Sequence, residues 1–171
     1  MDKRYFLIIF ILIMGLTSLF FISNNSDMIG TASVNVGNFI FSLPDGFILG
    51  HSERDTVALY NPNNNLNMNI QLVNGSDTYE SQLNWMQNSS SYTILSKGSI
   101  NINNVVVDSI YNKHYYNNNK YANSSIFYFN MYDNNFKIEI TGFDYDKNQN
   151  QTIQCLVDVI TSLKPNYEMG H

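Results

Sequence analysis

Residues 127–141, FYFNMYDNNFKIEIT, carry the clearest fold signal in the chain. Apolar side chains recur at every second position before and after the short polar turn at 133–135. Strict alternation of this kind is typical of half-buried strands, and a short turn of Asp and Asn residues is typical of an antiparallel hairpin. The stretch therefore predicts an antiparallel sheet that buries one face.

The same period of two extends outward from this hairpin. It predicts a strand at 34–43 that ends at Pro44-Asp45-Gly46, a regular strand at 66–72, and shorter or less regular strands at 55–60, 92–102 and 104–115. The residues between Gly50 and Asp55, which include His51, are expected to form a polar loop. The sheet should thus contain about six or seven strands.

Two segments show helical spacing instead. Asp77 and Glu80 have the spacing of a capping box, and Tyr79, Leu83 and Met86 then form an apolar stripe that ends in the serine run 89–91. A second stripe precedes Pro165 and consists of Ile153, Leu156, Val157, Ile160 and Leu163. The fold class is therefore α+β, in which an antiparallel sheet packs against helices.

The order of these elements resembles the PsbP/Mog-like superfamily. The resemblance covers residues 34–165 and is carried by LPDGF (43–47), YTIL (92–95), GSININNVVV (98–107) and VITSLKP (159–165). It is greatest to the short membrane-anchored PsbP-related proteins of methanogenic archaea. It implies an antiparallel sheet sandwiched by helices and, for several members, an accessory or assembly role without catalysis. It transfers no functional residues, because fold alone does not fix a site.

The N-terminus carries an apolar run at 5–22 after Lys3 and Arg4. Eighteen helical residues span roughly 27 Å, close to the hydrocarbon core of a bilayer. Because the positive charges precede the run, we expect the N-terminus in the cytoplasm and the rest outside it, at the cell membrane. We interpret 1–23 as a membrane anchor or signal segment, 24–33 as a flexible spacer, 34–165 as the domain and 166–171 as a tail.

Whether this leader is cleaved stays open on the sequence alone. The run is longer than the apolar region of a typical signal peptide, and Ser23 to Ser26 lack the small-residue pattern of a cleavage site. These two features favour an uncleaved single-pass anchor, whereas cleavage near Ser33 would give a secreted protein.

Composition excludes several classes of protein. Of 171 residues, only 13% are charged, and the net charge is −5, which argues against a nucleic-acid partner because phosphate binding needs a basic surface. The single cysteine, Cys155, excludes an internal disulfide framework and a four-cysteine zinc site. Cys155 is either a small hydrophobe beside the apolar stripe or a thiol that pairs with another chain.

The sequence contains no catalytic, cofactor-binding or metal-binding motif. It lacks the serine-hydrolase elbow, the phosphate-binding glycine loops and paired histidines at metal-ligand spacing. A hydrolase that uses His51 and Asp55 is a distant third hypothesis, because a solvated polar loop explains these residues better.

One stretch favours binding. Residues 111–121 read as a long hairpin tip rich in Tyr and Asn, whose candidate partner-binding residues are Tyr111, His114, Tyr115, Tyr116 and Tyr121. Tyr offers rigid amphipathic area and Asn adaptable hydrogen bonds, as in many recognition loops. An asparagine-rich turn also needs no partner at all, so both interpretations stay open.

The leading hypothesis is therefore a membrane-tethered extracytoplasmic domain that serves as a non-enzymatic accessory or interaction module. The alternative is an exported module that binds a sugar or a peptide through the Tyr/Asn-rich hairpin. An envelope protein or a glycan would be the partner, no cofactor is expected, and the oligomeric state is not indicated.

Overall fold

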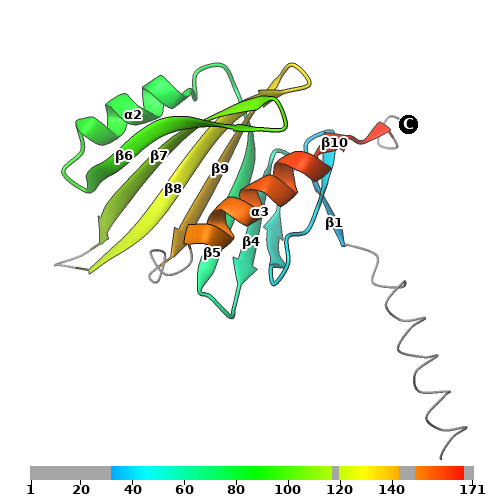
Figure 1. Ribbon diagram of the computed structural model, residues 1–171, viewed down its shortest axis with the longest axis horizontal. Helices are drawn as coiled ribbons and strands as arrows, with labels where there is room; N and C mark the ends of the chain where they lie inside the picture. The colour runs from blue at the N-terminus through cyan, green and yellow to red at the C-terminus, as the bar shows by residue number, and fades with distance from the viewer. Residues whose placement is uncertain (1–31, 117–119, 143–148, 168–171) are drawn as a thin grey trace, which may run out of the picture. The chain divides into compact units, whose positions relative to one another are not determined.

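The computed structural model describes residues 32–116, 120–142 and 149–167 (Figure 1). The predicted membrane segment 1–23 and most of the predicted spacer lie outside these residues. Within the described part of the chain, no helix is both long and apolar enough to cross a bilayer. The first described strand begins at Ser33, the last residue of the predicted spacer.

The described strands form two antiparallel sheets. The larger has the order β3-β4-β5-β9-β8-β7-β6, and the smaller has the order β1-β2-β10. The bounds of the strands in the larger sheet are β3 (Ile48–Ser52), β4 (Thr56–Asn61), β5 (Leu66–Val73), β6 (Tyr92–Ile102), β7 (Val105–Tyr116), β8 (Lys120–Met131) and β9 (Asn134–Gly142). Those in the smaller sheet are β1 (Ser33–Val36), β2 (Phe39–Ser42) and β10 (Lys164–Pro165).

Two tight turns set the register of the long hairpins. Tyr132 and Asp133 between β8 and β9 both have positive φ, as do Asn103 and Asn104 between β6 and β7. Two successive residues with positive φ define the type I′ turn, whose twist matches that of the flanking strands. The hairpin predicted around 133–135 is thus confirmed, with its turn one residue earlier.

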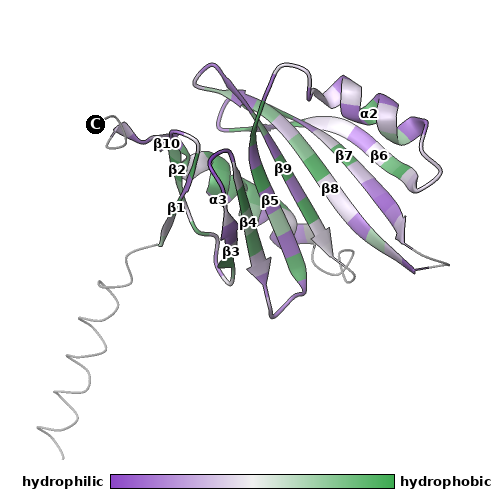
Figure 2. Ribbon diagram, turned by 180° about the vertical axis from the view of Figure 1, so that it is seen from behind, coloured by the Kyte–Doolittle hydropathy of each residue, from purple (hydrophilic) through white to green (hydrophobic). Residues whose placement is uncertain are grey.

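Two helices pack on opposite faces of the larger sheet: α2 (Tyr79–Gln87) and α3 (Gln149–Ser162). The main core lies between the sheet, the smaller sheet and α3, and β8 contributes Phe127 and Phe129 to it. The neighbouring side chains Ile126 and Tyr128 belong to a second core under α2. Because successive side chains of a strand point to opposite faces, α2 and α3 cover different sides. Figures 1 and 2 show α3 in front of the strands in one view and behind them in the other.

The predicted α+β class is confirmed, but five strands of the described chain precede α2 where the sequence predicts three. The expected strand at 34–43 is a hairpin of β1 and β2, because Gly37 adopts a φ of +56° and turns the chain. The segment around His51, expected as a loop, is β3, an edge strand whose five residues are all exposed. An edge strand with no buried face gives no apolar alternation, which explains why the pattern missed it.

Both helices occupy their predicted places, with corrections in detail. The capping box of α2 uses Thr78 and Ser81 rather than Asp77 and Glu80, and Tyr79, Leu83 and Met86 form its buried side as expected. On α3, Ile153 is 40% exposed, whereas Cys155 and Leu156 are buried. The buried stripe is therefore rotated from the predicted one towards Cys155.

Candidate binding surface

The predicted binding residues of the Tyr/Asn-rich hairpin do not form one tip. Tyr111, His114, Tyr115 and Tyr116 lie on β7, and Tyr121 lies on β8 opposite Tyr115. The strands extend to Tyr116 and Lys120, so the alternation of side chains divides the set between two faces. His114 and Tyr116 lie on the α2 face. Tyr115 and Tyr121 lie on the other face, as does Tyr111, which packs at the margin of the main core.

On the α2 face, four rings form a continuous line that we call the aromatic row: Trp85, Tyr92, His114 and Tyr116. Trp85 and Tyr92 have ring centroids 4.9 Å apart, and Tyr92 and His114 are stacked at 4.3 Å with planes 10° apart. His114 and Tyr116 are also 4.3 Å apart. The row thus joins α2, β6 and β7, and its end members stay open to solvent, Trp85 at 53% and Tyr116 at 44% exposure.

The aromatic row rests on a rigid base. Asn112, the next residue of β7 on the same face, is buried and bonds with Ser124 of β8, whose hydroxyl donates to Asn112 Oδ1 at 3.0 Å. Tyr92 packs, together with Ile94, against the second core under α2, to which Met86 belongs. Because its neighbours are fixed by packing and hydrogen bonds, the row presents its rings without further ordering.

The two tyrosines of the aromatic row, Tyr92 and Tyr116, are uncharged. Burial, with a smaller contribution from the Glu139 carboxylate, raises the pKa of both Tyr92 and Tyr116. Their hydroxyls therefore stay protonated and can donate hydrogen bonds at ordinary pH. The row combines apolar ring area with polar tips, the combination that favours tyrosine and tryptophan at interfaces.

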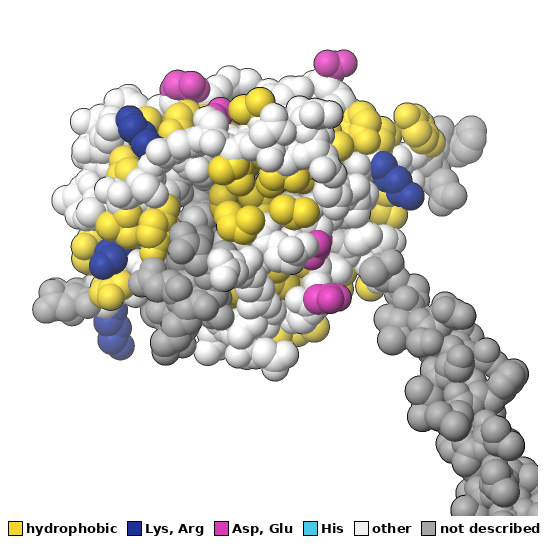
Figure 3. Space-filling model, viewed as in Figure 1, with side chains coloured by type: hydrophobic (Ala, Val, Ile, Leu, Met, Phe, Trp, Pro, Cys, Tyr) yellow, Lys and Arg dark blue, Asp and Glu magenta, His cyan; other side chains and the backbone are white. Residues whose placement is uncertain are grey.

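The opposite face of the same hairpin carries a smaller aromatic pair. Tyr115 and Tyr121 have centroids 6.2 Å apart, and Lys113 Nζ lies 4.5 Å from the centroid of the Tyr121 ring. Figure 3 shows Lys and Arg side chains beside hydrophobic ones at the left of the view, where Figure 1 places the ends of β7 and β8. The Lys113 ammonium group thus already occupies one face of the Tyr121 ring.

A groove adjoins the aromatic row, and we call it the edge groove. It has a volume of about 500 Å³ and is lined by Met86 and Gln87 of α2 and by residues 92–97 of β6. Lys97 is the charged residue in this lining. Tyr92 is shared by the groove and the row, so the two form one surface.

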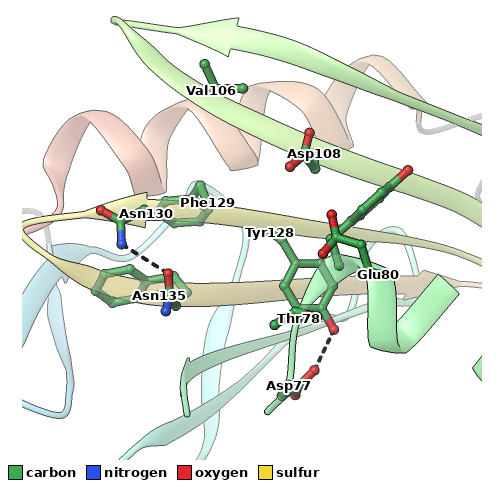
Figure 4. A pocket seen from close by; sticks show the side chains of 11 residues that line it. Asp77, Thr78, Glu80, Val106, Asp108, Tyr128, Phe129, Asn130 and Asn135 are labelled. Carbon is green, nitrogen blue, oxygen red and sulfur yellow. Dashed lines mark hydrogen bonds between the residues drawn. The ribbon is translucent and has the colours of Figure 1, made fainter. Parts of the chain in front are cut away.

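A second pocket, of about 280 Å³, lies at the start of α2 (Figure 4). Its acidic residues are Asp77, Glu80 and Asp108, and Figure 4 shows the Tyr128 hydroxyl directed at Asp77. Tyr128 donates to Asp77 Oδ1 at 2.8 Å, and Lys137 Nζ lies 3.4 Å from Asp77 Oδ2. Asp77 is thus engaged within the fold. In the described part of the chain, no group of three or more His, Cys, Asp or Glu side chains could hold a metal ion.

The structure also bears on two other sequence hypotheses. His51 Nε2 lies 3.1 Å from Glu53 Oε1, and both side chains are exposed. The hydrolase hypothesis for His51 and Asp55 stays a hypothesis. Cys155 is 4% exposed, and burial, with a smaller effect of Asp158, raises the pKa of its thiol to about 11. A buried, protonated thiol is poorly placed to pair with another chain, so the structure favours the interpretation of Cys155 as a small buried hydrophobe.

Sequence reasoning missed two members of the aromatic row, Trp85 and Tyr92. Trp85 carried a usable signal, because it lies off the stripe of Tyr79, Leu83 and Met86 and so had to face solvent. Tyr92 gave no such signal, since only the tertiary pairing of β6 with β7 places it opposite His114.

No protein-family model and no curated protein matches the chain. Among solved structures, the Ran-binding protein Mog1p of Saccharomyces cerevisiae aligns over 80% of this chain and 97% of its own, with 10% identity and a TM-score of 0.49. The cyanobacterial PsbP (CyanoP) of Synechocystis sp. PCC 6803 aligns over 75% and 86%, with 12% identity and a TM-score of 0.45. The protein of unknown function PA94 from Pseudomonas aeruginosa aligns over 75% and 94%, with 8% identity and a TM-score of 0.45.

These structures include Mog1p and a PsbP, and each has a TM-score below 0.5 with this chain. The likeness concerns the course of the chain and carries no residue or activity across. The relationship to membrane-anchored archaeal proteins stays a prediction.

Proposed function

We propose that the protein is a membrane-tethered, non-enzymatic interaction module whose domain lies outside the cytoplasm and binds a partner protein through the aromatic row. The observation that carries this proposal is the row itself: four rings from three elements, with successive ring centroids 4.3 to 4.9 Å apart and with both ends open to solvent. Exposed, preorganised aromatic side chains are the usual centres of binding energy in protein interfaces.

A protein partner fits this surface better than a glycan does. Sugar rings stack on free aromatic faces, but Tyr92 and His114 cover one another at an interplanar angle of 10°. The row therefore offers mainly ring edges and hydroxyl tips along its middle, which suit contacts with side chains and main-chain groups. Glycan binding at Trp85 or Tyr116 stays the alternative.

Tethering rests on the apolar run at 5–22 with Lys3 and Arg4 before it. The expected product is a full-length chain in the membrane fraction, with the domain accessible to added protease from outside the cell. A mature chain that starts near Ser33, or a full-length chain in the soluble fraction without detergent, would contradict the anchor.

In-cell chemical crosslinking followed by mass identification of neighbours tests the interaction role. We expect a partner that crosslinks to the native chain and is lost when Trp85→Ala and Tyr116→Ala are combined. The matched control combines Tyr115→Ala with Tyr121→Ala, which removes exposed rings of the same hairpin from the other face. Equal loss in both double variants would contradict a role specific to the aromatic row.

A further inference from the structure

Among the residues that the structure describes, strand β6 forms one edge of the larger sheet, with β7 on one side and no strand on the other. Its eleven residues are mostly exposed, and α2 packs against its first part. An edge strand presents a row of unpaired N–H and C=O groups and is a template for a further strand. The regular pairing of β6 with β7 runs from Ser96 to Ile102.

The type I′ turn at Asn103 and Asn104 identifies the backbone groups at the free edge. In a hairpin with a two-residue turn, the residues that flank the turn, Ile102 and Val105, form a hydrogen-bonded pair. Hydrogen-bonded and non-hydrogen-bonded pairs then alternate along the strands. The N–H and C=O groups of Lys97, Ser99 and Asn101 therefore point away from β7, towards the free edge.

The edge groove lies along this same edge. Its lining includes six successive residues of β6, 92–97. These residues belong to both faces of the sheet, since Ile94 pairs with Asn112 on the α2 face and Ser96 pairs with Tyr111 on the other. A cavity that is lined by residues of both faces lies beside the strand rather than on one face. Met86 of α2 also lines the groove, and the exposed side chain of Leu95 stands at the register shift between Ile94 and Ser96.

We propose that the edge groove and the free edge of β6 take an extended segment of the partner polypeptide, which adds as a strand along Lys97 to Asn101 and places an apolar side chain in the groove. This inference rests on the proposed function, because the segment would lie beside Tyr92 of the aromatic row. Strand addition of this kind obtains affinity from main-chain hydrogen bonds and selectivity from pockets for side chains.

Charge indicates what the segment carries. Lys97 lines the groove and, within the described residues, takes part in neither of the ion pairs that the domain forms. An acidic residue in the segment would therefore find an available ammonium group, while its apolar residues meet Met86, Ile94 and Leu95. The occupant is thus a strand with alternating apolar residues and at least one Asp or Glu.

The probe is a displayed library of random twelve-residue peptides, selected on the full chain in detergent micelles. Ser99→Pro removes an N–H that points to the free edge and removes none of the N–H groups that pair with β7. Ser99→Ala is its matched control, because it removes the same hydroxyl, which bonds to Asp108, and keeps the N–H. We expect enriched acidic, alternating peptides that bind Ser99→Pro at least about tenfold more weakly than Ser99→Ala, a loss of roughly 1.4 kcal/mol.

Thermal unfolding shows whether Ser99→Pro keeps the fold. If it does not, Lys97→Glu serves instead, and the preference of selected peptides should change from acidic to basic residues. Failure to enrich peptides, or equal binding to both Ser99 variants, overturns the inference while leaving the crosslinking result at the aromatic row unaffected. A dimer of the native chain that Ser99→Pro abolishes also overturns it, because a second copy would then occupy the edge.

Discussion

The imidazole of His114 on β7 lies parallel to the ring of Tyr92 on β6, with centroids 4.3 Å apart and planes 10° apart. The two residues are direct cross-strand partners in the register of the hairpin. Trp85 and Tyr116 extend this pair at either end, so the pair is the centre of the aromatic row. Its geometry has consequences for stability as well as for binding.

A double-mutant cycle of Tyr92→Ala and His114→Ala should show that the two rings stabilise the fold jointly. Stacked aromatic pairs contribute about 0.5–1.5 kcal/mol beyond the area they bury. We therefore expect a coupling free energy of that size in denaturant unfolding of the two single variants and the double variant. Additive effects within experimental error would mean that the rings do not stack in solution.

Tyr128 should make stability depend on alkaline pH. Burial first, and then the hydrogen bond to Asp77 and its negative charge, raise the pKa of Tyr128 far above its usual value of 10.0. Because the folded pKa lies above the unfolded one, this contribution is complete below about pH 10 and is lost as pH rises further. Unfolding free energies at pH 8 and pH 11 measure it.

The control for this pH dependence is Tyr128→Phe, which keeps the ring and lacks the titrating hydroxyl. It should be less stable than the native chain by about 1–3 kcal/mol at pH 8, since a hydrogen bond to a carboxylate is lost. The difference between the two proteins should then shrink at pH 11. An unchanged difference at the two pH values is the opposing result.

Cys155 should react with thiol reagents only after unfolding. Its side chain is buried in the main core, and its thiol pKa of about 11 leaves little reactive thiolate at pH 8. We expect slow labelling of the folded chain, complete labelling in denaturant, and a monomeric band on a non-reducing gel. Rapid labelling of the folded chain would show that α3 does not bury this residue.

Gly142 and Gly98 form a matched pair of strand glycines. A Cβ at Gly142 would lie 2.6 Å from Leu66 Cδ2 and 3.1 Å from the Asn65 carbonyl oxygen, whereas a Cβ at Gly98 meets nothing within 4 Å. Gly142→Ala should therefore cost about 1–3 kcal/mol through overpacking. Gly98→Ala should be neutral or stabilising by up to about 1 kcal/mol, because alanine loses less backbone entropy. Equal effects of the two substitutions in urea unfolding would contradict the packing around Gly142.

Half-buried elements could be predicted from the sequence because burial of one face makes apolar residues recur at regular intervals. The hairpin at 127–141 and the buried side of α2 were found in this way. The sequence did not predict β3, because this strand has no buried face. It placed Ile153 on the buried side of α3, because helical periodicity locates a buried stripe only to within about one residue. Hydrophobic periodicity therefore predicts only those elements that have one buried face.

The candidate site was only half predictable for a different reason. The sequence singled out His114 and Tyr116 but grouped them with Tyr115 and Tyr121, which the pleat of the strands sends to the other face. Trp85 and Tyr92 are distant from this hairpin in sequence and join it through the packing of α2 and the pairing of β6. Sites assembled from several elements depend on such tertiary contacts.

Photocrosslinking in cells tests the central claim most directly. A photoreactive phenylalanine analogue replaces Trp85 in one strain and Tyr121 in another, two exposed aromatic positions on opposite faces of the sheet. Our account predicts a discrete crosslinked product with the same partner protein from position 85 and none of that product from position 121. The same product from both positions, or from position 121 alone, would contradict it.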